Sequence, residues 1–204
     1  MGTIAGFFNN LNVDDLCKKH NIQYMVETGT GFGDSVAWGV EQPYFKEVYS
    51  VEIHKQTYDN CVKRFESNSN VKIINQDSIS FLTEICKLDG NILFFLDAHF
   101  PGCYHADNDG NLYVSIDIDA NPEELNWPLE LEIPLIQRLR QGKSDCIIID
   151  DLRVYEYGIF DGPCPSNLMR LNPINEMGKC FLETHDLFRF YNNEGYAAFI
   201  PKDN

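Results

Sequence analysis

Short apolar runs alternate along this chain with segments of helical spacing, and this alternation restricts the fold more than any other feature. Near-continuous runs of Val, Ile, Leu and Phe are typical of parallel strands buried on both faces. Five such runs cover residues 24–27, 48–53, 71–75, 92–96 and 146–149. Helices are predicted between them, at 35–42, 55–66, 78–87 and 128–140. This order predicts a doubly wound α/β fold, because right-handed crossovers place helices on both faces of a parallel sheet.

The C-terminal part departs from the alternation. Two aromatic-rich runs, 185–191 and 196–200, are joined by Asn192-Asn193-Glu194-Gly195, which is typical of a hairpin turn. The sequence therefore predicts a mostly parallel, seven-stranded sheet that ends in a C-terminal antiparallel hairpin. A length of 204 residues, of which 44% are hydrophobic, fits a single domain spanning 1–204.

Charge restricts the expected partners. The chain has 31 acidic against 16 basic residues, a net charge of −15. Such a surface repels nucleic-acid phosphates and anionic lipids, so we expect neither nucleic acid nor a membrane as a partner. No apolar run approaches the ~20 residues of a membrane-spanning helix. Seven cysteines without a Cys-x-x-Cys pair do not form a disulfide framework, which favours a reducing, cytoplasmic location.

Two long segments, about 99–127 and 152–180, follow the ends of predicted strands. Ligands bind at that edge of an open α/β sheet, and loops of this length are usually functional. The first segment is an acidic insertion, since residues 88–137 contain ten acids and no Lys or Arg. Asp109-Gly110 predicts a hairpin turn within it. We expect a lid or a substrate-selecting flap, with a solvated loop as the alternative.

A glycine-rich turn, 27–35, connects the first predicted strand to the first helix. Glycines let the backbone approach a ligand and leave helix N–H groups beside it. The pattern E-x-G-x-G-x-G resembles the first motif of class I (Rossmann-like) S-adenosylmethionine-dependent methyltransferases, and it also fits the E-x-G-x-x-x-G-x-S form of catechol-type O-methyltransferases. The resemblance implies that the methionine part of the cofactor is bound by Glu27, Thr28, Gly29, Gly31, Gly33 and Ser35.

Acids at the next two strand ends extend this resemblance, which covers roughly residues 22–151. Glu52-Ile53 ends the second predicted strand, and Asp77-Ser78 follows the third. The resemblance implies that Glu52 binds the ribose hydroxyls and that Asp77 binds the adenine amino group. It also implies that Ile53, Ser78 and Asp97 contribute to the cofactor site. Capping of the next helix is the alternative for Asp77.

Three carboxylates, Asp97, Asp150 and Asp151, follow the fourth and fifth predicted strands. Adjacent ends of parallel strands lie ~5 Å apart, so these groups would repel one another unless a cation such as Mg²⁺ lies between them. Their placement resembles that in metal-dependent O-methyltransferases acting on catechols or on the sugars of macrolide and aminocoumarin antibiotics. The resemblance implies that all three are Mg²⁺ ligands, with strand-end capping as the alternative for the pair. Arg153 is expected to hold one carboxylate in place.

The catalytic candidates are Asp97 and His99. The sugar-modifying enzymes read D-G-D where this chain reads Asp97-Ala98-His99. A methyl sulfonium is a strong electrophile, so the protein mainly needs alignment and a deprotonated oxygen. A metal lowers the pKa of a coordinated hydroxyl, and an imidazole can take its proton. His99 is therefore the expected base, with a structural loop histidine as the alternative.

Together these features predict an O-methyltransferase that uses S-adenosylmethionine and Mg²⁺ to methylate a hydroxyl of a small molecule or a glycan sugar. Three alternatives stay open: a non-catalytic binding or assembly protein that keeps the fold, a nucleic-acid methyltransferase, and an aminopropyl transferase. The nucleic-acid alternative is disfavoured by the charge and by the lack of a Pro-Pro-Tyr motif after the fourth strand. The acceptor and the oligomeric state, a homodimer included, stay open.

Overall fold

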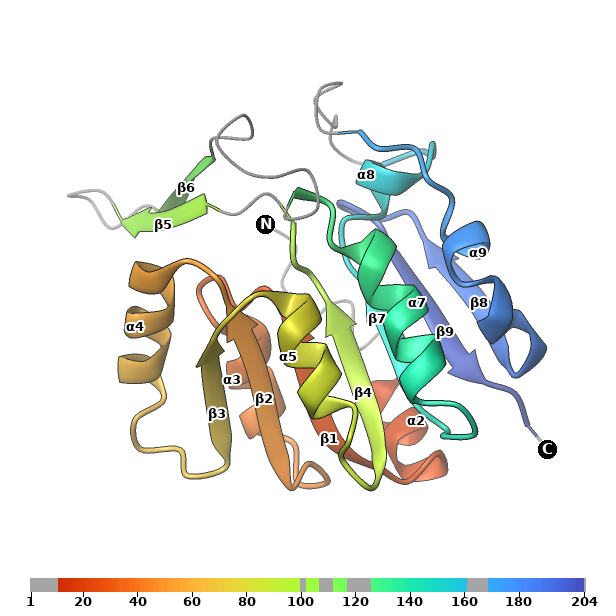
Figure 1. Cartoon of the computed structure of the whole chain (residues 1–204), viewed down its shortest axis with the longest axis horizontal. Coiled ribbons are helices and arrows are strands. Elements are labelled where there is room, and N and C mark those ends of the chain that lie inside the picture. The colour runs from red at the N-terminus through yellow and green to blue at the C-terminus, as the bar shows by residue number, and fades with distance from the viewer. Residues whose placement is uncertain (1–10, 100–101, 107–111, 117–125, 161–168, 204) are drawn as a thin grey trace.

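A seven-stranded mixed sheet forms the centre of the protein, with helices on both sides (Figure 1). The computed structural model describes residues 11–99, 102–106, 112–116, 126–160 and 169–203, the second and third of these ranges by their backbone. The strand order is β3-β2-β1-β4-β7-β9-β8. The strands are β1 (Ile22–Thr28), β2 (Glu47–Glu52), β3 (Val71–Asn75), β4 (Asn91–Leu96), β7 (Cys146–Ile149), β8 (His185–Phe190) and β9 (Tyr196–Pro201).

The pairing confirms the predicted fold class. The first five of these strands run parallel to one another, whereas β9 pairs antiparallel with both β7 and β8. The C-terminal hairpin therefore completes the sheet, with its second strand on the inside. Every predicted strand and helix is present, and the ends differ from the predicted ones by at most two residues.

Two apolar clusters, one on each face of the sheet, explain why the strands read as continuous apolar runs. Along β4, Phe94 packs into the cluster beneath α5 and α7, whereas Leu93 and Phe95 pack into the cluster that includes residues of α2 and α3. Since alternate residues of one strand are buried on opposite faces, no polar positions remain along it. The helices are α2 (Val13–Lys19), α3 (Asp34–Val40), α4 (Lys55–Arg64), α5 (Ser78–Ile85), α7 (Leu129–Leu139), α8 (Leu152–Tyr155) and α9 (Ile174–Met177), with a 3-10 helix η3 at Lys179–Glu183.

The acidic insertion contains a separate two-stranded ribbon. β5 (Gly102–Ala106) and β6 (Leu112–Ile116) pair antiparallel, as the predicted hairpin requires. The predicted turn at Asp109-Gly110 lies outside the described residues. The ribbon lies next to α4, beyond the carboxyl edge of the sheet (Figure 1). This position is compatible with the expected flap, whose role stays a prediction.

Among the described residues, no helix has the length and apolar character needed to cross a bilayer. Cysteine side chains are described at five positions and all are free thiols, at Cys17, Cys61, Cys86, Cys146 and Cys180.

Candidate functional site

The glycine-rich turn after β1 has a backbone that only glycine adopts readily. Gly29, Gly31 and Gly33 have φ values of 83°, 51° and 81°, in the left-handed region. A Cβ atom on Gly29 would lie 2.8 Å from the carbonyl oxygen of Asp97. The turn is therefore pressed against the loop that follows β4, and the two predicted parts of the site are in direct contact.

Buried acids hold this turn in place. Glu27 is fully buried, and its carboxylate accepts hydrogen bonds from the Ser35 hydroxyl and, at 2.5 Å, from the Ser50 hydroxyl. Burial raises the pKa of Glu27 well above its usual range. Glu52 accepts hydrogen bonds from the backbone N–H of Gly31 at 3.2 Å and of His54 at 2.8 Å. Both acids thus lie around the turn, as predicted, and each is bound to groups of the chain itself.

The predicted adenine-binding residues lie at the start of α5. Asp77 is the N-cap of that helix, and its side chain accepts a hydrogen bond from the Ser80 N–H at 2.8 Å. Ser78 is 9% exposed and Ile53 is 37% exposed. The capping alternative for Asp77 is therefore observed, while contact with adenine stays a prediction.

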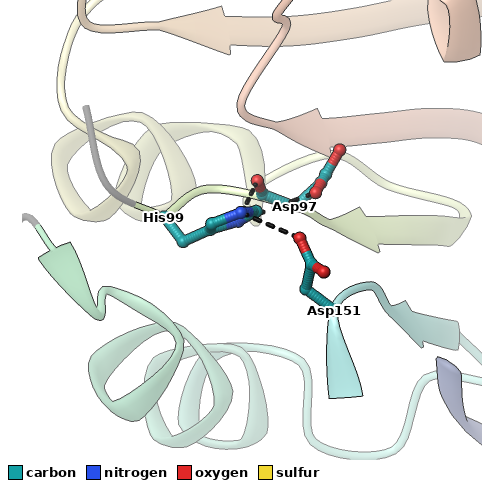
Figure 2. A group of neighbouring side chains, drawn as sticks. All are labelled: Asp97, His99 and Asp151. Carbon is teal, nitrogen blue, oxygen red and sulfur yellow. Dashed lines mark hydrogen bonds and ion pairs between the residues drawn. The ribbon is translucent and has the colours of Figure 1, made fainter. Parts of the chain in front are cut away.

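Three side chains converge beyond the ends of β4 and β7. Possible ligand atoms of Asp97, His99 and Asp151 all lie within 4.8 Å of one another (Figure 2). His99 Nε2 lies 2.9 Å from Asp151 Oδ2, and His99 Nδ1 lies 3.0 Å from the carbonyl oxygen of Asp97 and 3.7 Å from its Oδ1. We refer to these three residues as the acidic triad.

Asp150, the third predicted metal ligand, lies at the same edge but outside the triad. Its Oδ1 accepts the backbone N–H of Asp151 at 2.7 Å, and its charge raises the pKa of Asp97. The three predicted carboxylates therefore lie at one edge of the sheet, and His99 takes the place of Asp150 in the group of converging side chains. Arg153 Nε lies 3.1 Å from Asp151 Oδ1, which confirms the expected role of Arg153.

The charges at this edge are unbalanced. Partial burial, together with Asp150 and Asp151, raises the pKa of Asp97 well above its usual range. Burial and the charge of Asp151 raise the pKa of Asp150 to about 8. Burial acts to raise the pKa of Asp151, but His99 and Arg153 outweigh burial, and this pKa is lowered. Burial acts to lower the pKa of His99, but Asp151 outweighs burial, and this pKa is raised. Such repulsion fits a site that binds a cation.

We expect the metal-free protein to lose stability as the pH rises from about 5 to about 8. The folded protein keeps protons on Asp97 and Asp150 that the unfolded chain releases above about pH 4, so the free energy of unfolding falls with pH. The raised pKa of His99 acts in the same direction, and the lowered pKa of Asp151 acts only below this window. A loss of about 2 kcal/mol would lower the unfolding midpoint by roughly 4–8 °C.

Thermal unfolding in chelator, measured across that pH range, checks this expectation. Asp150→Asn should flatten the profile, because the substituted side chain has no proton to release. A midpoint that rises with pH in the unmodified protein would contradict it.

Three residues of this edge were not predicted from the sequence: Ser50, Glu132 and Tyr155. Glu132 is completely buried on α7, and its Oε2 accepts a hydrogen bond from Thr28 Oγ1 at 3.3 Å. Tyr155 is 3% exposed, and burial, with the charge of Glu132 next in effect, raises the pKa of its phenol well above its usual range. A signal for Glu132 did exist, since it lies on the apolar face between Leu129 and Ile136.

Two cavities in the described part of the protein lie away from this edge. One, of about 690 Å³, is lined by residues at the end of α7, at η3 and at the end of β9. The other, of about 380 Å³, lies between α2 and β8. Neither contains a member of the acidic triad.

No known protein-family profile matches this sequence, and no curated protein is similar to it in sequence. Similar structures nevertheless exist. An O-methyltransferase from Bacillus cereus in complex with SAH has a TM-score of 0.58 and 14% identity, covering 92% of this chain and 77% of that one. A Staphylococcus aureus protein provisionally assigned as a caffeoyl-CoA O-methyltransferase has a TM-score of 0.55 and 12% identity, covering 93% and 81%. The chain thus has the fold of class I S-adenosylmethionine-dependent methyltransferases.

Proposed function

We propose that this chain, which has the class I methyltransferase fold, is an S-adenosylmethionine-dependent O-methyltransferase that uses a divalent cation. The observation that carries the proposal is the contact between the glycine turn and the acidic triad, since Gly29 touches the backbone of Asp97. A methyl donor on the turn and an oxygen acceptor beside the triad would then be neighbours. The similarity to solved O-methyltransferases, one of them with SAH, supports the same reaction class.

The cofactor would be bound along the carboxyl edge of β1, β2 and β3. The left-handed glycine turn, with Gly29, Gly31 and Gly33, would bind its methionine part, and Ser35 donates a hydrogen bond to Glu27 beside the turn. Glu52, at the end of β2, would bind the ribose hydroxyls, and Asp77 the adenine amino group. On SAH binding, the Glu52 carboxylate would accept hydrogen bonds from these hydroxyls in addition to those from the backbone N–H groups of Gly31 and His54.

Carboxylates of Asp97, Asp150 and Asp151 would hold the cation. When bound there, a divalent cation lowers the pKa of a coordinated acceptor hydroxyl. Carboxylate ligands suit Mg²⁺ or Mn²⁺, whereas imidazole suits Mn²⁺, Fe²⁺ or Zn²⁺ better than Mg²⁺. Mg²⁺ therefore fits if His99 stays outside the coordination sphere, and Mn²⁺ fits if His99 enters it.

His99 is our candidate for the base. Its Nδ1 lies 3.0 Å from the carbonyl oxygen of Asp97, which accepts hydrogen bonds only and so keeps the proton on Nδ1. Nε2 is then the nitrogen that would take a proton from the acceptor. It lies 2.9 Å from Asp151 Oδ2, and this ion pair would have to open before Nε2 could act as a base, as when Asp151 turns to hold the cation. The hydrogen bond at Nδ1 would keep the imidazole oriented during that change.

The acceptor would be a neutral or cationic hydroxyl compound, such as a sugar. Residues 88–137 contain ten acidic residues and no Lys or Arg, and this charge disfavours an anionic acceptor. The same argument disfavours nucleic acid as a substrate. The free thiols of the described cysteines fit a reducing, cytoplasmic location.

Calorimetric titration with SAH, followed by a methyl-transfer assay, tests the proposal. We expect SAH to bind, and we expect labelled methyl to pass from S-adenosylmethionine to a sugar or catechol hydroxyl with Mg²⁺ or Mn²⁺ but not in chelator. Absence of SAH binding would favour a non-catalytic protein that keeps the fold. Transfer of an aminopropyl group instead of methyl would favour the aminopropyl transferase alternative.

A further inference from the structure

Glu132 is a buried acid that neither the fold nor the proposed reaction explains so far. It lies on the apolar face of α7 and is completely buried. Its Oε1 has no hydrogen-bond partner among the residues that the structure describes. Burial raises the pKa of this carboxyl to about 7, although hydrogen bonds from Ser78 and Thr28 act against the rise. A buried carboxyl with an unpaired oxygen costs free energy, so stability alone does not account for it.

The partners of Glu132 connect it to both halves of the proposed site. Thr28 is the last residue of β1, and it donates its hydroxyl hydrogen to Glu132 Oε2 at 3.3 Å. The carbonyl oxygen of Thr28 accepts the backbone N–H of Asp97 at 3.0 Å. Ser78 is the first residue of α5, directly after Asp77. One carboxyl group on α7 therefore joins the end of β1, the start of α5 and, through Thr28, the loop after β4.

We propose that Glu132 is a positioning residue that holds Thr28 and Ser78 together and so fixes the wall of the pocket for the adenosyl part of the cofactor. This inference rests on the proposed function above. Glu132 does not touch the cofactor, because its side chain has no exposed surface. Glu132 acts through the hydroxyl groups of Thr28 and Ser78. Loss of either hydrogen bond would allow one side of the pocket wall to move.

Glutamine and methionine at this position separate the possible roles. Gln keeps a carbonyl oxygen that can accept from Thr28 and Ser78. Met has a similar length, fills the same apolar space and accepts hydrogen bonds only weakly. Glu130 provides the matched control, because it lies on the same helix but pairs with Arg170 at 2.9 Å.

The dissociation constant of SAH, measured by calorimetry, is the readout, with thermal unfolding as a check on folding. We expect Glu132→Met to weaken SAH binding about tenfold, Glu132→Gln to stay within about threefold, and Glu130→Gln to have no effect. Wild-type affinity in a folded Glu132→Met variant would overturn the inference. Failure of the unmodified protein to bind SAH would instead overturn the proposed function.

A double-mutant cycle tests the route through Thr28 and also serves if Glu132→Met does not fold. Thr28→Val removes the same hydrogen bond from the other side with little change in shape, and Ser78→Ala removes the second bond. We expect each to weaken SAH binding several-fold. We expect the losses from Glu132→Met and Thr28→Val not to add, because both changes remove one and the same hydrogen bond. Wild-type affinity in both hydroxyl variants would overturn the inference.

Discussion

Replacing Asp97 by Asn is expected to lower methyl transfer roughly a thousandfold, which corresponds to about 4 kcal/mol of transition-state stabilisation. Asp97 is the member of the acidic triad that also touches the glycine turn. The amide removes the negative charge needed for a cation but keeps the backbone against which Gly29 packs. SAH affinity should therefore change much less than the rate.

The same substitution should stabilise the metal-free protein. Burial, and then the charges of Asp150 and Asp151, raise the pKa of Asp97, so the neutral amide avoids both the cost of burying a charge and the repulsion. Rate, SAH affinity and unfolding midpoint together check this expectation. Asp186→Asn, an exposed position on β8, makes the same charge change far from the triad and should alter none of the three. If Asp97→Asn kept a tenth of the activity, Asp97 would be excluded as a cation ligand.

The fold could be read from the sequence because local patterns and tertiary packing agree. Strand β4 has apolar residues at every position from Ile92 to Leu96 since both of its faces are covered, and no helix or exposed strand requires that composition. The glycine turn could be predicted equally well, because three glycines in seven residues favour a left-handed backbone, which the structure has at all three. Chain direction then placed the acids that follow β2, β4 and β7 at one edge.

Which donor atoms converge at that edge could not be read. Asp151 has φ 52°, a left-handed conformation that no residue pattern announces, and it is Asp151 rather than Asp150 that meets His99. Strand ends fix a position to within a few ångströms, whereas a coordination site depends on single backbone rotations. At Asp77 the sequence cannot distinguish two roles, because a helix N-cap and an adenine ligand require the same residue type at the same position.

Glu132 was missed for a third reason, namely that it was counted with the surface charge of the acidic region. Its spacing from Leu129 and Ile136 is that of a buried stripe, and an acid within such a stripe signals a buried interaction. Burial of single residues depends on neighbours distant in sequence, here Thr28 on β1. The apolar spacing on α7 could therefore indicate that Glu132 is buried, but not that Thr28 is its partner.

The second large effect is expected at the glycine turn, where Gly29→Ala should weaken SAH binding at least about a hundredfold. Two costs combine. A left-handed backbone costs a residue with a Cβ roughly 1–2 kcal/mol, and Gly29 has φ 83°. The new Cβ would also lie 2.8 Å from the carbonyl oxygen of Asp97 and 3.0 Å from Cα of Ala98. Both are backbone atoms, so the contact is relieved only if the turn and the loop after β4 move apart.

Gly142→Ala separates these two costs. Gly142 has φ 78°, almost the same backbone conformation, but no atom lies within 4 Å of the position that a Cβ would occupy. This variant should lose a similar 1–2 kcal/mol of stability and keep SAH affinity, so the difference between the two variants measures the contact with Asp97 alone. Calorimetry with SAH and thermal unfolding give both quantities. Equal affinity in the two variants would mean that the turn can separate from the loop after β4 without loss, and the proposed link between cofactor and cation sites through this contact would be wrong.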